Sequence, residues 1–246
     1  SALAPFGLRT VRGADVGASA ALERGDLEIQ DEGSQLVAHL VGAKPGMQVL
    51  DLCAGAGGKS LAMAADMKNK GHLVAADSHS GRLTRAKHRL KRAGVENTEC
   101  VIPDAKWLKA KGGRFDRVLV DAPCTGTGAW GRNPDQRWTL DAGALPRLAA
   151  EQDALLDKAA QMVKPGGILV YATCSLLLEE NEDRVRAFRD RHPAFELIPA
   201  RRAWSDLGLP SWPCTGQEYF RVSPARNGMD GFFAALLQRP LIGGLP

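Results

Sequence analysis

Two cysteines in polar, turn-forming contexts are the residues of this chain best suited to covalent chemistry. Cys124 stands in the segment 121–128 (DAPCTGTG), and Cys174 stands in the segment 171–175 (YATCS). Each segment follows or ends an apolar run typical of a β-strand, and parallel strands bring their carboxyl ends to the edge of a sheet where ligands bind. Because a thiolate is a strong nucleophile, the two segments predict thiol chemistry in a single crevice.

A glycine-dense turn is the second chemical signal. Residues 50–60 (LDLCAGAGGKS) run from a strand into a helix, and glycines let a backbone approach its ligand closely. The turn is not a Walker loop, since Cys53 occupies a required glycine position, and not a dinucleotide fingerprint, since Ser60 does the same. Asp77 and Asp104 follow the next two strands, where carboxylates suit ribose hydroxyls and an adenine edge. This combination favours S-adenosylmethionine, a sulfonium cation without phosphates, over NAD or ATP.

A thiol beside such a cofactor suits methyl transfer to one kind of carbon, C5 of a pyrimidine. That carbon becomes nucleophilic when a thiolate adds to C6, and loss of the C5 proton later expels the thiol. The carboxyl group of Asp121, hydrogen-bonded to N3 and the exocyclic amine of cytosine, would stabilise the charge that develops. Position alone leaves open which thiol attacks. The remaining cysteines are interpreted as small buried side chains, the commonest role of cysteine: Cys53, Cys100 and Cys214.

Lys59 stands in the first turn of the helix that follows the glycine turn. A cation near the amino terminus of a helix is unfavourably placed with respect to the helix dipole. The position therefore indicates an anionic partner for Lys59, such as the carboxylate of the cofactor.

Apolar runs and amphipathic stretches alternate from about residue 45 onwards, the pattern of a doubly wound α/β sheet. Seven runs are predicted to be strands: 46–52, 72–76, 99–102, 115–120, 167–172, 195–198 and 231–237. Helices are predicted over 34–41, 59–68, 80–93, 144–163 and 179–191, and a long functional loop over 202–229. In this arrangement the glycine turn and both cysteine segments lie at one edge of the sheet.

The composition narrows the class of protein. The 246 residues are 44% hydrophobic and 24% charged, and the net charge of +4 permits a polyanionic partner without requiring one. The apolar stretches are far shorter than the roughly 18 residues of a membrane span, so no membrane association is expected. Five cysteines without a CxxC pair indicate neither a disulfide framework nor a metal site, and favour a reducing cytoplasm.

From about residue 26 to residue 239, the chain resembles the RNA cytosine-C5 methyltransferases of the RsmB (Fmu/Sun) type. The segments that carry the resemblance are 29–36, 50–60, Asp77 with 82–83, 104–105, 121–128, 132–138, 171–175, 179–182 and 230–233. The resemblance implies a class I methyltransferase (Rossmann-like) fold, a mainly parallel seven-stranded sheet whose last strand is antiparallel. One departure is the loop sequence CAGAGGK at 53–59, where the family usually has CAAPGGK; the change gives the backbone more freedom.

The family's functional residues can be assigned to matching positions. In this family the nucleophile is the cysteine of the Thr-Cys-Ser motif, here Cys174, and the Pro-Cys thiol, here Cys124, assists release of the product. DNA cytosine-C5 methyltransferases use the Pro-Cys thiol instead, so this assignment depends on family likeness. Asp121 is the third catalytic residue. The implied cofactor contacts are Cys53, Ala54, Gly55, Ala56, Gly57, Gly58, Lys59, Asp77, Arg82, Asp104 and Asp121.

Relatives of this type usually carry an upstream RNA-binding region. Residues 1–30 are therefore interpreted as a lead-in or as the remnant of such a region, and residues 31–246 as the methyltransferase catalytic domain. The basic stretch 82–92 is interpreted as a solvated helix face. Better candidates to hold phosphates and stack a base follow the Pro-Cys motif, namely Arg132, Arg137 and Trp138. Trp204 and Trp212 are interpreted as either stacking or core residues.

The sequence thus predicts an enzyme that transfers a methyl group from S-adenosylmethionine to C5 of a cytosine in RNA through a covalent cysteine–C6 adduct. The cytosine must leave its stack to be reached, so single-stranded or flipped-out RNA is the expected partner. Ribosomal RNA is the favoured substrate. Transfer RNA, or a cofactor-binding RNA-assembly module with little catalysis, are the alternatives. No oligomer is required.

Overall fold

A mixed β-sheet forms the centre of the molecule. The computed structural model describes residues 1–10 and 14–241, and in this part of the chain the sheet has eight strands. The strands are β1 (Gln48–Asp51), β2 (His72–Ala76), β3 (Thr98–Val101), β4 (Phe115–Asp121), β5 (Val163–Thr173), β6 (Glu196–Ile198), β7 (Phe220–Val222) and β8 (Phe232–Gln238). Their order is β3-β2-β1-β4-β5-β8-β6, and β7 also pairs with β8.

The first five strands run parallel, and the order of the sheet reverses between β1 and β4. β8 lies between β5 and β6 and is antiparallel to both. These pairings confirm the predicted doubly wound class I methyltransferase sheet with an antiparallel last strand. In such sheets the ligand-binding crevice lies at the carboxyl ends of the strands where the order reverses.

The predicted number of seven strands is too low by one, because the short strand β7 was not expected. Along β8, residues 236–238 pair with β6 and residues 232–234 pair with β7. Since β5 occupies the other edge of β8, β6 and β7 follow one another along the same edge, interrupted by residues 199–219. Three residues inside a loop rich in proline and glycine give too short a pattern to predict a strand.

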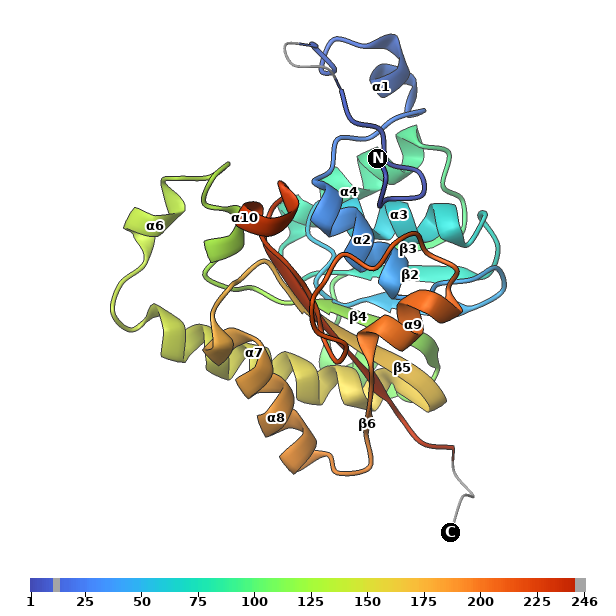
Figure 1. Ribbon diagram of the computed structural model, residues 1–246. Helices are drawn as coiled ribbons and strands as arrows, with labels where there is room; N and C mark the ends of the chain where they lie inside the picture. The colour runs from blue at the N-terminus through green and yellow to red at the C-terminus, as the bar shows by residue number, and fades with distance from the viewer. Residues whose placement is uncertain (11–13, 242–246) are drawn as a thin grey trace.

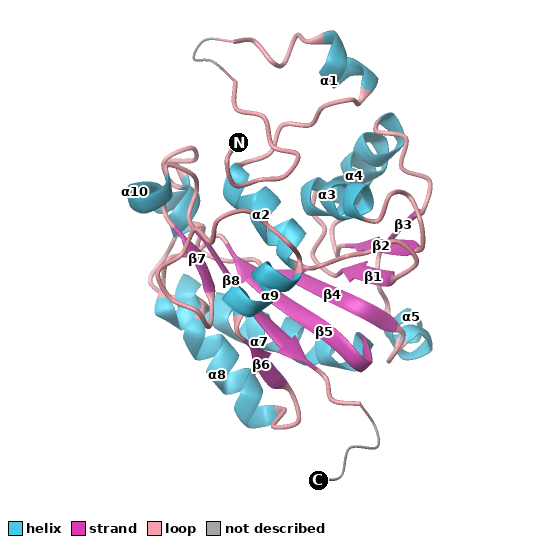
Figure 2. Cartoon of the chain, turned by 45° about the vertical axis from the view of Figure 1, so that its right-hand side comes forward, coloured by secondary structure: helices cyan, strands magenta, loops and turns pink. Residues whose placement is uncertain are grey.

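Helices cover both faces of the sheet (Figure 1). The helices are α1 (Ala20–Arg24), α2 (Glu32–Leu40), α3 (Gly58–Asp66), α4 (Ser80–Arg92), α5 (Ala105–Lys111), α6 (Gln136–Thr139), α7 (Ala144–Met162), α8 (Glu182–Arg191), α9 (Ala200–Asp206) and α10 (Pro224–Asn227). Two short 3-10 turns are η1 (Thr127–Ala129) and η2 (Leu178–Glu180). α2, α3, α4 and α9 lie on one face, and α5, α7 and α8 lie on the other (Figure 2).

Alternation along the strands supplies a separate core for each face. Leu119 in β4 and Val170 in β5 pack toward α2 and α3, whereas Val118 and Leu169 pack toward α7 and α8. All four side chains are fully buried. Successive residues of a strand point to opposite faces, so a sheet covered on both sides requires continuous apolar runs. This requirement explains why the central strands could be predicted from short runs of valine, isoleucine and leucine.

The elements that the sequence did not predict are short or irregular. The expected loop over 202–229 contains the end of α9, β7 and α10, and α5 was also not predicted. Trp204 in α9 is 1% exposed and stacks on Phe220 at 5.9 Å between ring centroids, so it is a core residue. The helix expected over 179–191 begins only at Glu182, because the chain first forms η2.

The segment before α2 stands above α2, α3 and α4 (Figure 1). Glu28 connects it to α4 through ion pairs with Arg89 at 3.0 Å and Arg92 at 2.7 Å. Asp31 caps α2, its carboxylate accepting a hydrogen bond from the backbone of Gly33 at 2.8 Å. The predicted division at residue 30 stays a prediction; residues 11–13 of the expected lead-in and 242–246 of the expected catalytic domain lie outside the described residues.

Candidate active site

The two cysteine segments meet at the carboxyl edge of the sheet. Cys124 lies in the loop after β4, and Cys174 lies directly after β5, the neighbouring strand. Their Sγ atoms are 3.4 Å apart, within hydrogen-bonding distance for sulfur. Both side chains are half-buried, so each keeps access to solvent. Residues 122–128 and 174–177, which carry the two sulfurs, are called the thiol loops below.

The two thiols differ in acidity. The pKa of Cys174 is lowered, first because the Cys124 thiol hydrogen-bonds to its sulfur and also because the Lys59 ammonium is near, although burial and the Asp121 carboxylate oppose the shift. The pKa of Cys124 is raised well above its ordinary value by the same hydrogen bond and by burial. A thiolate is the reactive form of cysteine. The contact between the two sulfurs therefore favours the thiolate of Cys174 over that of Cys124.

Lys59 crosses the crevice and pairs with Asp121. Its Nζ lies 2.6 Å from Oδ2 of Asp121 and 4.9 Å from the ring centroid of Phe232. Asp121 is the last residue of β4, next to β1, so this ion pair spans the point where the sheet order reverses. The anionic partner expected for Lys59 is thus a protein carboxylate. The Asp121 side chain keeps 30% of its surface exposed.

The glycine turn, residues 53–59, connects β1 to α3 through left-handed backbone. Gly55 has φ 56° and Gly57 has φ 82°, values that favour glycine. A Cβ atom on Gly57 would lie 3.0 Å from that of Ala86 in α4, whereas a Cβ on Gly55 would have no neighbour within 4 Å. Gly57 is the N-cap residue of α3, and Gly58 is the first residue of the helix.

Backbone hydrogen bonds hold the rest of the glycine turn. Ala54 donates from its nitrogen to the carbonyl of Ala76 in β2 at 2.9 Å, and the carbonyl of Ala56 accepts from Arg89 at 2.8 Å. Burial raises the pKa of the Cys53 thiol far above its usual range. Cys53, which is half-buried, is therefore kept in its thiol form at neutral pH and is not a nucleophile.

Asp77 joins the turn to the end of β2. One of its carboxylate oxygens accepts a hydrogen bond from the backbone of Gly55 at 2.9 Å, and the other accepts from the backbone of His79 at 2.8 Å. An ionised carboxylate has acceptor sites beyond these two. Asp77 therefore fixes the glycine turn and retains lone pairs that could accept ribose hydroxyls.

Asp51, the last residue of β1, is a site residue that sequence reasoning did not select. It is 1% exposed; its Oδ2 accepts a hydrogen bond from Ser60 at 2.7 Å, and its Oδ1 has no partner among the described residues. Burial raises the pKa of Asp51 to about 7, and the nearby carboxylates of Asp121 and Asp77 add to the shift. The rule that picked Asp77, an aspartate that ends a strand, would also have found Asp51.

Within the described residues, no hydrogen bond or ion pair joins the side chain of Asp104 or Arg82 to another candidate residue. Asp104 is exposed and caps α5, with its Oδ1 accepting from the backbone of Trp107 at 2.6 Å. Arg82 is exposed on the first turn of α4. The structure thus divides the candidate residues into an assembled centre and two outlying side chains.

A buried carboxylate supports the thiol loops from behind. Glu180 is fully buried; it accepts hydrogen bonds from the backbone nitrogen of Thr125 at 2.9 Å and from Gln152 at 3.1 Å, and also from the hydroxyl of Thr125 at 2.5 Å. Gln152 donates as well to the carbonyl of Pro123 at 2.9 Å. Because Thr125 and Pro123 flank Cys124, these bonds fix the backbone on both sides of that thiol.

A second set of bonds fixes the Cys174 loop. Asn181 is fully buried; it accepts from the hydroxyl of Thr173 at 2.5 Å and donates to the carbonyl of Ser175 at 3.0 Å. The carbonyl of Cys174 accepts from the nitrogen of Gly128 at 2.9 Å, which joins the two loops directly. In the sequence, Glu180 and Asn181 look like solvated residues at the start of a helix, and no local signal indicated that they turn inward.

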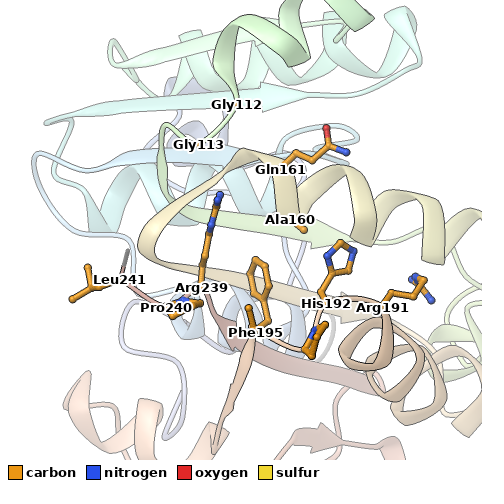
Figure 3. A pocket seen from close by; sticks show the side chains of 12 residues that line it. Gly112, Gly113, Ala160, Gln161, Arg191, His192, Phe195, Arg239, Pro240 and Leu241 are labelled. Carbon is orange, nitrogen blue, oxygen red and sulfur yellow. The ribbon is translucent and has the colours of Figure 1, made fainter. Parts of the chain in front are cut away.

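The two described cavities lie away from the thiols. One, of about 850 Å³, lies at the opposite edge of the sheet and is lined by residues that include Gly113, His192 and Arg239 (Figure 3). The other, of about 1190 Å³, lies between the segment before α2 and helices α2 and α3. Neither is lined by Cys124 or Cys174 among the described residues.

Residues 1–10 and 14–241 contain neither a candidate membrane span nor a candidate metal site. None of the helices there has the length and apolar character needed to cross a membrane. In the same residues, no group of three or more histidine, cysteine, aspartate or glutamate side chains is arranged to hold a metal ion.

A family model described as "16S rRNA methyltransferase RsmB/F" matches residues 38–238 of the chain. A ribosomal RNA small subunit methyltransferase B of Vibrio cholerae is 36% identical over 217 residues, which is 87% of this chain and 46% of that protein. The chain spans about half the length of the curated relatives that it matches. The match covers the glycine turn and both thiol loops.

Solved structures share the fold. The crystal structure of PH0851 superimposes with a TM-score of 0.83 and 37% identity, over 92% of this chain and 50% of that one. NSun6 from Pyrococcus horikoshii, solved with SFG, an analogue of S-adenosylmethionine, gives a TM-score of 0.78 and 28% identity, over 92% of this chain and 56% of that one. These likenesses confirm the predicted fold and the resemblance from which it was expected.

Proposed function

Because the chain belongs to the 16S rRNA methyltransferase RsmB/F family, a family of S-adenosylmethionine-dependent methyltransferases, we propose that it methylates C5 of a cytosine in ribosomal RNA. The observation that carries the proposal is the contact of the Cys124 and Cys174 sulfurs at 3.4 Å, beside the Lys59–Asp121 ion pair. Methyl transfer to a nitrogen or oxygen would need no thiol, whereas transfer to C5 of a pyrimidine needs a nucleophile at C6.

Cys174 is the nucleophile in this proposal. Its thiolate adds to C6 of the cytosine, and the electrons of the C5–C6 double bond move toward C5. Once C5 holds the methyl group that the bound cofactor would supply, solvent water can accept the C5 proton. The electrons of that C–H bond re-form the C5–C6 double bond, the C6–sulfur bond breaks, and Cys174 leaves as its thiolate. The lowered pKa of Cys174 favours both addition and departure, because the thiolate is the attacking and the leaving form.

Asp121 binds the base, and Cys124 assists release. The Lys59 ammonium holds the Asp121 carboxylate at the sheet edge, where it can accept hydrogen bonds from the exocyclic amine of cytosine and from N3 when that nitrogen is protonated. Cys124 remains protonated while it hydrogen-bonds to Cys174. While Cys174 is bound to carbon its sulfur carries no negative charge, so that hydrogen bond is weak; as the C6–sulfur bond breaks, the Cys124 thiol donates a hydrogen bond to the departing Cys174 thiolate and stabilises it as the leaving group.

The residues around the glycine turn fit S-adenosylmethionine. That cofactor supplies, when bound, an electrophilic methyl group on a sulfonium centre. The carboxylates of Asp77 and Asp121 lie close enough to Asp51 to raise its pKa, and the Lys59 ammonium lies close enough to lower it. This excess of carboxylates suits a cationic ligand, and Oδ1 of Asp51, which has no partner in residues 1–10 and 14–241, offers it a buried acceptor. Gly55, with open space where a Cβ would lie, lets the turn approach a ligand.

The proposal is tested with unmodified 16S ribosomal RNA and S-adenosylmethionine labelled in its methyl group. After digestion to nucleosides, the label is expected in 5-methylcytidine. Cys174→Ala should abolish the label, whereas Cys100→Ser, which removes a thiol from β3, should retain it. Label in another nucleoside, or label that survives Cys174→Ala, would contradict the proposal.

A further inference from the structure

An exposed stack of two tryptophans and an arginine lies beside the thiol loops. The guanidinium carbon of Arg137 is 4.7 Å from the ring centroid of Trp138 and 6.0 Å from that of Trp130. Trp138 is 78% exposed, more than any other large hydrophobic side chain in the described residues. Since one face of its ring is covered by Arg137, the exposed surface includes the opposite face. These three residues are called the Trp–Arg stack below.

The Trp–Arg stack is hydrogen-bonded to the loop that carries Cys124. The indole nitrogen of Trp130 donates to the carbonyl of Thr125, the residue after Cys124, at 3.2 Å. The side chain of Gln136 approaches so closely that its Oε1 would lie 2.7 Å from a Cβ on Gly126. A short chain of contacts therefore runs from Cys124 through Trp130 and Arg137 to Trp138.

An ion pair secures the same segment from the other side. The Nε of Arg132 lies 2.8 Å from Oδ2 of Asp230, whose backbone nitrogen in turn donates to the Asp31 carboxylate at 3.2 Å. Figure 1 shows that α6, which carries Arg137 and Trp138, stands away from the sheet on the connection between β4 and α7. The segment is thus anchored at its base and presents Trp138 to solvent beside the crevice.

The chemistry of the Trp–Arg stack suits an unpaired nucleobase. Every base has a π face that can stack on an indole, and a guanidinium on the far side of the indole strengthens such platforms. Arg137 has no carboxylate partner within the described residues, so its positive charge is available to a polyanionic strand. A duplex offers no free base face, since its bases are already stacked.

We propose that Trp138, held by Arg137, stacks a nucleobase that flanks the target cytosine in a single-stranded RNA segment. The inference rests on the proposed function and adds to it a nucleotide-binding subsite outside the catalytic centre. It assigns the connection between β4 and α7 a role in selecting RNA in which the neighbour of the target base is unpaired.

The test compares Trp138→Ala and Trp138→Phe with the wild-type protein. Affinity is measured by fluorescence anisotropy with a short, fluorescein-labelled RNA of mixed sequence, single-stranded or annealed to its complement. Trp138→Ala is expected to weaken single-strand binding by roughly 5- to 100-fold and to leave duplex binding unchanged. Trp138→Phe should retain most of the affinity, because a phenyl ring also stacks. Leu241→Ala, which removes another exposed apolar side chain at the opposite edge of the sheet, should change neither.

Kinetics separate this inference from the function on which it rests. With an unmodified RNA that the wild-type protein methylates, Trp138→Ala should raise KM for RNA and leave kcat near the wild-type value, whereas a structural defect would lower kcat and the melting temperature. Unchanged single-strand affinity in Trp138→Ala, or an equal loss for duplex RNA, would overturn the subsite. A wild-type protein that transfers no methyl group but still loses single-strand affinity on Trp138→Ala would overturn the proposed function and leave the subsite in place.

Discussion

The glycine turn and the thiol loops lie at the same sheet edge, but they are held by different kinds of interaction. The glycine turn depends on backbone: left-handed glycines, carbonyl acceptors and a single carboxylate, Asp77, that binds backbone nitrogens. The thiol loops depend on buried side chains, with Glu180 and Asn181 each holding two segments together. Buried hydrogen bonds of this kind connect segments that are far apart in the chain, although Oε1 of Gln152 has no partner among the described residues.

The difference matches what each region has to do in the proposed reaction. The thiol loops must keep two sulfurs at a fixed separation, and small displacements of reacting groups are costly in rate. The glycine turn must approach a ligand, and it leaves one buried carboxyl oxygen of Asp51 without a protein partner among the described residues. The thiol loops, where the covalent bond is proposed to form, are thus the more firmly held region. The glycine turn, where the cofactor is proposed to bind, keeps an acceptor oxygen that a ligand can use.

The largest expected effect comes from breaking the network behind the thiol loops. Glu180→Ala leaves the buried donors of Thr125 and Gln152 without their acceptor, at a cost of about 3–5 kcal/mol in the free energy of unfolding. For a domain of this size that corresponds to a melting temperature lower by roughly 6–20 °C. The matched control is Glu179→Ala, an exposed neighbour, which should change the free energy of unfolding by less than about 0.5 kcal/mol. Equal melting temperatures for the two variants would contradict the claim that the buried bonds of Glu180 hold the thiol loops.

The second prediction concerns Asp51, beside the glycine turn, and how protein stability and cofactor affinity change with pH. Asp51 has a pKa of about 7, raised from 3.8, so the folded protein keeps a proton that the unfolded chain loses. Its contribution to stability is therefore full below about pH 4 and is lost as the pH rises through 7. The ionised form attracts a cationic cofactor, so the affinity for S-adenosylmethionine should rise roughly tenfold between about pH 6 and pH 8.

Calorimetric titration of the wild-type protein and of Asp51→Asn measures this dependence. The variant carries no titratable group at position 51, so its cofactor affinity should vary much less over the same pH range. A pH dependence of equal size in Asp51→Asn would show that another group controls cofactor binding.

The smallest predicted effect concerns the link between the two regions. Lys59→Met removes the cation that helps to lower the pKa of Cys174, so less of that thiol is ionised at neutral pH. Alkylation of Cys174 by iodoacetamide at pH 7, followed by peptide mass spectrometry, should become about threefold slower. Lys70→Met, which removes an exposed lysine beyond α3, should leave the rate unchanged. A rate unaffected by Lys59→Met would separate the thiol loops electrostatically from the glycine turn.

The same contrast explains what the sequence could predict. The glycine turn, Asp77 and the cysteine segments were found because strand ends and left-handed turns have local signatures, such as an aspartate after an apolar run. Asp51 meets the same rule and could have been included. Lys59 was recognised as needing an anionic partner, but the identity of that partner, Asp121, depends on strand order, which brings β4 next to β1.

The support of the thiol loops could not be predicted from local patterns. Glu180 lies 55 positions from Thr125, and charged residues are rarely buried without partners. Only the fold brings those partners together, through the pairing of β4 with β5 and the packing of α7 against η2. β7 was missed for a related reason, because a strand of three residues is defined by its partner β8 and not by its own sequence.

The division of labour between the two thiols is the central claim, and trapping of the covalent adduct tests it most directly. Cys124→Ala incubated with 16S ribosomal RNA and S-adenosylmethionine should accumulate a protein–RNA adduct that migrates slowly on a denaturing gel, because Cys174 forms its bond to C6 and release is impaired. Cys174→Ala should form no adduct. An adduct with Cys174→Ala and none with Cys124→Ala would contradict the account by reversing the two roles.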